Sequence, residues 1–211
     1  AILYLAPADN LDGVNVCSMA EIAGCKVACL YTAGRGKMNS VQAGRLRKTM
    51  LWRDDREGFL ATLKQDIHKF TKYCEKRGIQ PVVRLNGTSD IMWENYLDME
   101  TEFPTVQFYD YTKIVKRAYK ALPSNYHLTL SYSEANADYA QSVLQAHKDT
   151  GRNVAVVFRE KDSMPSSFAG SATLDGDKDD LRFLDASQHV VALYAKGDAK
   201  KDASGFVIDT H

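Results

Sequence analysis

Several features that would assign a protein to a functional class are absent from this sequence. The 27 Lys and Arg residues balance 27 Asp and Glu residues, so a strongly basic nucleic-acid-binding protein is disfavoured, although a local basic patch is not. No apolar run approaches the roughly 20 residues that a membrane span requires, and we expect no membrane partner. No Gly-x-Gly-x-x-Gly pattern follows the first predicted strand, which disfavours a dinucleotide-binding fold. Neither a phosphate-binding loop nor a Ser/His/Asp set points to a kinase or a hydrolase.

The composition is that of a folded globular protein. Hydrophobic residues make up 45% and charged residues 26% of the 211 residues, whereas a disordered chain carries fewer apolar residues and more net charge. No linker, repeat or low-complexity segment divides the chain, so we predict a single domain over residues 1–211. Residues 1–37 would hold the first strand and a cysteine-rich loop, and residues 196–211 a polar C-terminal tail.

Strand-like and helix-like segments alternate about six times along the chain. Continuous apolar strands separated by amphipathic helices predict an α/β fold with a parallel sheet covered on both faces. The sheet would be open and doubly wound or a partial (β/α)6 barrel. The predicted strands are 1–7, 81–85, 106–109, 127–132, 154–158 and 190–194; the predicted helices are 38–55, 57–77, 93–99, 112–122 and 135–150; residues 160–189 are predicted to be a loop.

The four cysteines are unevenly placed, and three of them form the spacing Cys17-x7-Cys25-x3-Cys29. Clustered thiols in an intracellular protein are typically metal ligands or redox groups, although two disulfides are also compatible with four cysteines. A structural zinc site takes four ligands, usually as two close pairs, whereas a short stretch with three thiolates is typical of an iron–sulfur cluster. We therefore favour a [4Fe-4S] cluster with one open iron over zinc. Cys74 lies in a predicted helix and is expected to be a buried apolar residue.

The residues around these cysteines are compatible with a built site. Gly24, Gly34 and Gly36 would let the backbone pass close to a cluster and direct N–H groups at its sulfurs. Arg35 begins a stretch of basic residues, and its charge could hold an anionic ligand beside the cluster. Solvent-exposed helix faces explain most of the other basic residues of that stretch.

Polar residues follow three successive predicted strands, where sites lie in parallel α/β folds. Any one of Ser89, Asp90, Ser133 and Asn136 could be a helix N-cap, but together the segments indicate a polar pocket. Asp90 and Asp110 would orient a substrate or move protons. The candidate ligand-binding residues are Asn86, Thr88, Ser89, Ser133 and Arg35. His127 and His147 are interpreted as structural.

Three motifs resemble a known family. The stretches Gly24–Gly36 (GCKVACLYTAGRG), Arg84–Ile91 (RLNGTSDI) and Gln107–Lys113 (QFYDYTK) are similar to the gene-product-eighty-eight-like proteins of bacteriophages, and the resemblance covers most of the chain. It implies a phage origin, and hence a place in the cytoplasm of an infected host cell. It implies no defined reaction.

The order of a strand, a three-cysteine loop and βα units resembles, more distantly, the radical S-adenosylmethionine enzymes. That resemblance implies a partial barrel whose open iron binds S-adenosylmethionine, with Asn86, Thr88 and Ser89 near the methionine part. The sequence departs from that pattern, because the usual Cys-x3-Cys-x2-Cys spacing and a Gly-Gly-Glu after the second strand are missing.

Three functions therefore stay open. The first is an enzyme, radical or otherwise, that uses the cluster on a small-molecule ligand at the open iron. The second is a redox or sensor module without turnover, in which Cys74 or another residue is the fourth ligand. The third is a zinc-stabilised interaction protein.

Overall fold

The computed structural model describes residues 1–161 and 164–210 and shows an α/β protein with one mostly parallel, open sheet. In the described residues the sheet has eight strands, in the order β1-β2-β3-β4-β7-β6-β5, with β8 paired to β4. The strands are β1 Val82–Val83, β2 Gln107–Thr112, β3 Tyr126–Ser131, β4 Val154–Phe158, β5 Ser167–Phe168, β6 Ser171–Asp175, β7 Val190–Tyr194 and β8 Val207–Ile208. The α-helices are α1 Asn39–Asp54, α2 Arg56–Glu75, α3 Met99–Glu102 and α4 Ala137–Thr150, and the 3-10 helices are η1 Leu30–Thr32, η2 Gly34–Lys37, η3 Trp93–Asn95, η4 Val115–Tyr119, η5 Arg182–Leu184 and η6 Gly197–Lys201. None of the helices in these two ranges is long and apolar enough to span a bilayer.

The chain divides into two compact units, each assembled from three separate stretches. Unit 1 comprises Ala1–Cys17, Met38–Asp110 and Ala121–His127. Unit 2 comprises Ser18–Lys37, Tyr111–Lys120 and Leu128–His211.

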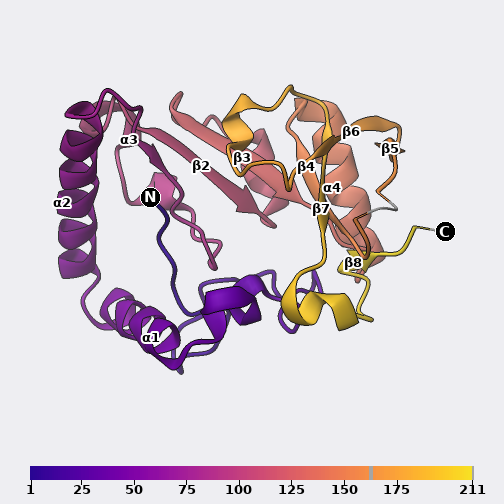
Figure 1. Cartoon of the computed structure of the whole chain (residues 1–211), viewed down its shortest axis with the longest axis horizontal. Helices are drawn as coiled ribbons and strands as arrows, with labels where there is room; N and C mark the ends of the chain where they lie inside the picture. Colours follow the sequence, from indigo (N-terminus) through magenta and orange to yellow (C-terminus); the bar gives the residue numbers. More distant parts are fainter. Residues whose placement is uncertain (162–163, 211) are drawn as a thin grey trace. The chain divides into compact units, whose positions relative to one another are not determined.

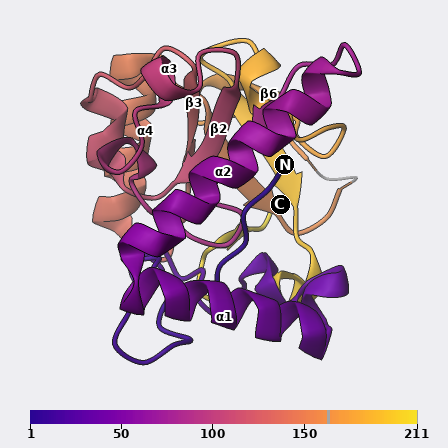
Figure 2. The same cartoon turned by 90° about the vertical axis from the view of Figure 1, so that its left-hand side faces the viewer.

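Unit 1 is built on two helices and an aromatic core. Helices α1 and α2 follow one another with only Asp55 between them (Figure 2), and the Asp55 side chain caps α2 by accepting the Gly58 N–H at 2.9 Å. Trp93 is fully buried, and its ring centroid lies 5.2 Å from that of Trp52 and 6.3 Å from that of Phe59. Aromatic burial of this kind contributes most of the stability of a small core.

Unit 2 holds the longest parallel ladder. β4 pairs with β7 from Val154 opposite Val190 to Phe158 opposite Tyr194, and α4 lies alongside these strands (Figure 1). Asn136 caps the start of α4, and Gly151, with φ of 70°, ends it in the left-handed conformation. Apolar side chains of the helix and of both strands therefore share one core.

The parallel α/β class and most of the regular elements are confirmed, with β4 and β7 at the predicted bounds. Four predictions were wrong. Residues 1–7 contribute only an isolated bridge, from Ile2 to Arg84. Within the predicted helix 112–122, Thr112 ends β2 and only Val115–Tyr119 are helical, as the 3-10 helix η4, which lacks a side-chain N-cap. Residues 160–189 include β5 and β6, and residues 196–211 include η6 and the buried strand β8.

These last two predictions failed for a common reason. β6 has an interrupted apolar pattern, with the half-exposed sequence SATLD, and β8 contains only two residues. Hydrophobic periodicity needs a longer run than either strand offers. Both strands exist because an ordered neighbour, β7 or β4, supplies the hydrogen-bonding partners.

Candidate functional site

The predicted cluster ligands come from both units. Cys17 ends the first stretch of unit 1, where its partly buried thiol lies 3.6 Å from the carbonyl oxygen of Thr88. Its backbone N–H donates to Asn15 Oδ1 at 2.8 Å. The thiol therefore sits beside the second predicted polar motif of the same unit.

Cys25 and Cys29 lie in unit 2, in a segment of turns that leads into η1. The Cys25 thiol is 3.7 Å from the carbonyl oxygen of Ala20, and Cys29 caps η1 by accepting the Tyr31 N–H at 3.5 Å. An N–H directed at a sulfur stabilises the thiolate, which is the form that binds metal. Both thiols remain partly exposed.

Gly24, which precedes the second cysteine, is required by close packing. Its φ is +63°, and a Cβ atom there would lie 2.5 Å from Ser204 Oγ and 2.7 Å from Ala135 Cβ. The Ser204 hydroxyl donates to the Gly24 carbonyl at 3.0 Å. The prediction that small residues shape this loop therefore has a local cause, which is contact with residues 204 and 135.

Cys74 is a core residue of α2, as predicted, with 1% of its surface exposed. No disulfide joins any of the four cysteines, all of which lie in the described ranges. In the same ranges, no three His, Cys, Asp or Glu side chains are grouped in a way that would hold a metal ion. The loop thiols are thus partly exposed and are not joined in disulfides, whereas Cys74 is buried.

Three of the predicted polar residues meet in unit 1, around a buried carboxylate. The Asn86 N–H and the Tyr126 hydroxyl donate to Asp110 at 2.6 Å and 2.8 Å, and Asp110 is fully buried. Asn86 Oδ1 accepts from the Ser89 hydroxyl at 2.8 Å and from Trp93 Nε1 at 3.0 Å. This network joins the segment after β1 to β2 and to η3, so Asp110, Asn86 and Ser89 have structural partners.

The remaining predicted residues are separate from this network. The Thr88 hydroxyl donates to the carbonyl of Leu5, and the Asp90 N–H donates to the carbonyl of Val16 at 2.7 Å. In unit 2, Ser133 Oγ accepts the N–H of Ala135 at 3.2 Å in a local turn. Arg35 lies in η2 and is exposed.

A hollow of unit 2 lies next to the cysteine loop. Its volume is about 510 Å³, and it is lined by Val27, Ala28, Asp198, Lys201, Asp202, Ala203 and Ser204. Val27 and Ala28 are two of the three residues between Cys25 and Cys29. The other five lining residues belong to the segment predicted as a polar tail, so sequence reasoning missed them. The only feature of the sequence that could have indicated these lining residues is the pattern of charged residues in that segment.

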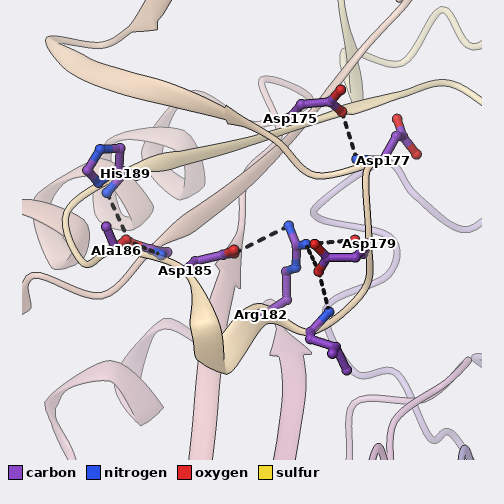
Figure 3. Close-up of polar contacts among 9 residues, drawn as sticks. Asp175, Asp177, Asp179, Arg182, Asp185, Ala186 and His189 are labelled. Carbon is purple, nitrogen blue, oxygen red and sulfur yellow. Dashed lines mark hydrogen bonds and ion pairs between the residues drawn. The ribbon is translucent and has the colours of Figure 1, made fainter.

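Several aspartates lie between the end of β6 and the start of β7 (Figure 3). Asp175 accepts the N–H of Asp177 at 3.0 Å. The buried Arg182 guanidinium lies 3.2 Å from Asp179 Oδ1 and 3.3 Å from Asp185 Oδ2, the second contact being an ion pair without hydrogen-bond alignment. An internal cation and backbone N–H groups thus engage the carboxylates of Asp175, Asp179 and Asp185 and hold the loop in a folded turn.

The pKa of Tyr132, which directly follows β3, is strongly perturbed. Burial, reinforced by the charge of Glu134 and by the hydrogen bond to it, raises this pKa to about 12. An unfolded tyrosine ionises near pH 10, so between about pH 10 and 12 the native state retains a proton that the unfolded state loses. Stability must therefore fall as the pH rises through this window.

Replacing Tyr132 with phenylalanine is expected to remove the part of the stability loss at alkaline pH that comes from this tyrosine. Urea midpoints of both proteins at about pH 9 and pH 11 measure it, and the wild type should lose more stability than the variant. Tyr73→Phe is the matched control, because Tyr73 is about half exposed and should leave the pH dependence unchanged. An equal alkaline loss in wild type and Tyr132→Phe would contradict the assignment.

Comparison with known proteins gives one match. The family described as Gene product 88 matches residues 1–210. The chain belongs to the Gene product 88 family. No curated protein and no solved structure is significantly similar to it. The phage-family prediction is thus confirmed, and this Gene product 88 chain has to be interpreted from its own geometry.

Proposed function

We propose that this Gene product 88 protein binds a [4Fe-4S] cluster through Cys17, Cys25 and Cys29 and works in the infected host cell. The observation that carries the proposal is the hollow of unit 2, since Val27 and Ala28 of its lining lie between Cys25 and Cys29, whose thiols are partly exposed and not joined in a disulfide. Three thiolates leave one iron open, and the hollow offers room for a small-molecule ligand.

The donor set of the chain fits such a cluster. Thiolate is the ligand that iron–sulfur clusters take, and metal sites commonly become ordered only when the metal binds. The Tyr31 N–H would stabilise the Cys29 thiolate, and the exposed Arg35 would attract an anionic ligand. When bound, the cluster would supply one-electron transfer or a Lewis-acidic iron.

A redox or sensor role without turnover is better supported than a reaction. Asn86, Ser89 and Asp110 are the residues expected to bind cofactor or substrate, and they are hydrogen-bonded to one another inside unit 1. A radical S-adenosylmethionine enzyme with a partial barrel is the second proposal, and Asp90 is its remaining candidate acid. Cys74 is disfavoured as a fourth ligand because it is buried in α2.

Cluster binding is tested on protein purified without oxygen. We expect a brown protein with about four irons and four sulfides per chain, as a cubane cluster requires. Cys17→Ser, Cys25→Ser and Cys29→Ser should each lower the iron content at least about tenfold, because loss of one thiolate removes a ligand. Cys74→Ser is the matched control and should keep the wild-type spectrum.

Two results would contradict the proposal. A colourless protein with one zinc per chain would instead support the zinc-stabilised interaction protein. Equal iron in all four variants would mean that the loop thiols are not the ligands. Added S-adenosylmethionine under a strong reductant separates the two proposed roles, since only the radical enzyme would release methionine and deoxyadenosine.

A further inference from the structure

Ser171 and His147 form a hydrogen-bonded pair in unit 2 that the proposed cluster does not use. Ser171 Oγ lies 2.8 Å from His147 Nε2, and His147 Nδ1 lies 2.7 Å from the carbonyl oxygen of Arg152. Ser171 is on β6 and His147 is near the end of α4. Because 24 positions separate the two residues, no local sequence motif indicates the pair.

The hydrogen bond to the Arg152 carbonyl selects one tautomer of the neutral His147 imidazole. A carbonyl oxygen only accepts, so Nδ1 of the neutral ring must carry the proton and Nε2 must present its lone pair. The Ser171 hydroxyl then donates to Nε2. A hydroxyl that donates to an oriented imidazole is the arrangement in which histidine removes the proton of a nucleophile.

Burial differs between the two partners in the way that such a pair requires. His147 is 3% exposed and is held against the core by α4, so its ring orientation is fixed. Ser171 is partly exposed. It follows a two-residue turn in which Ala169 and Gly170 have φ of 50° and 86°. A Cβ atom at Gly170 would meet nothing within 4 Å, so other residues do not pack against the turn at Gly170, which precedes Ser171.

The positive φ of Ala169 indicates that the turn is held under strain. Left-handed backbone at a residue other than glycine costs energy and persists only where the surroundings fix it. Here the pairing of Ser167 with Ala172 and of Phe168 with Ser171 fixes it. The first residue of β6 is therefore presented in one conformation.

A second serine of the same unit provides an internal contrast. Ser131 Oγ accepts a hydrogen bond from Lys113 Nζ at 2.8 Å, so an ammonium group engages its lone pair. Such a contact makes the oxygen a poorer nucleophile, and Ser131 is also 92% buried, with 8% exposure. Both serines thus lie beside a titratable side chain, but of the two only Ser171 has a partner that can accept its proton.

We propose that Ser171 is a nucleophile, that His147 is its general base, and that carboxylic esters are the substrate class. Ser171 Oγ bonds to the acyl carbon while its proton passes to His147 Nε2. The alkoxide leaves with that proton as an alcohol, and the acyl group stays on the serine until water hydrolyses it. A fluorophosphonate traps the first step: the Oγ–P bond forms, the P–F bond breaks, fluoride leaves and His147 takes the proton.

The test uses the full chain and a fluorophosphonate probe. We expect one adduct per chain, mapped by peptide mass spectrometry to Ser171, and loss of this adduct in Ser171→Ala. His147→Gln should slow the labelling roughly 100-fold, the usual share of a general base. Ser131→Ala is the matched control and should label at the wild-type rate.

The wild-type protein alone keeps the proposal falsifiable if a variant fails to fold. Native protein should be labelled at Ser171, and the same protein unfolded in urea should not. No native adduct, an adduct on another serine, or equal labelling in urea would show that the Ser171–His147 contact is only a structural tie between β6 and α4. An unchanged labelling rate in folded His147→Gln would overturn the role of the histidine.

Discussion

Replacing Asp110 with alanine is expected to destabilise the protein by about 3 kcal/mol or more. The carboxylate is fully buried and accepts from the Asn86 backbone, the Asn86 side chain and the Tyr126 hydroxyl. Its removal leaves these donors without an acceptor in a site that water does not reach. Each such orphaned group costs about 1–3 kcal/mol.

Urea denaturation followed by circular dichroism measures the effect as a lower midpoint. Asp66→Ala is the matched control, because Asp66 is exposed and lies 3.7 Å from Lys69 in a surface pair worth at most about 1 kcal/mol. Asp110→Asn should fall between the two, since it keeps the shape but loses the charge. If Asp110→Ala were no less stable than Asp66→Ala, Asp110 would not hold β2 to the segment that follows β1.

An aspartate at position 208 is expected to prevent stable folding of unit 2. Ile208 is 6% exposed and lies in β8, where it pairs with Phe158 of β4. A carboxylate there would be buried among the apolar side chains of the core that β4, β7 and α4 share, and such substitutions are among the most destabilising, about 4 kcal/mol or more. The protein should be largely insoluble or lack a cooperative transition.

Position 203 supplies the control in the same segment. Ala203 is exposed, so Ala203→Asp adds the same charge without burying it and should change the urea midpoint little. Wild-type stability in Ile208→Asp would mean that β8 is not part of the core and that residues 196–211 do behave as the polar tail that the sequence suggests.

Long amphipathic elements could be predicted from sequence because one face of each is buried along its whole length. α2 repeats apolar residues at helical spacing, and Phe59 and Ile67 are indeed buried. β4 and β7 are continuous apolar runs and were found at their predicted bounds. Elements such as β8 depend on an already formed neighbour, and their own residues carry too little pattern to mark them.

In the candidate site, too, features set by the local sequence could be predicted, and features set by contacts between distant residues could not. The burial of Cys74 follows from its place in α2, and the capping role of Asn136 follows from its position before an amphipathic run. The internal use of Asp110 by Asn86 could not be predicted, because 24 residues separate the two. The lining of the hollow by residues 198–204 required β8 to bring the last segment back to the sheet.

The chain crosses from one unit to the other five times, at positions 17/18, 37/38, 110/111, 120/121 and 127/128. Neither unit can therefore be expressed as one uninterrupted fragment, and a protease cut between two stretches would leave both units incomplete. During synthesis, unit 1 cannot be finished before residue 127 leaves the ribosome, and the strand that closes unit 2 emerges some 80 residues later. Assembly of unit 2 must wait until β8 has been synthesised, so products truncated before β8 should be degraded and not accumulate as partly folded protein.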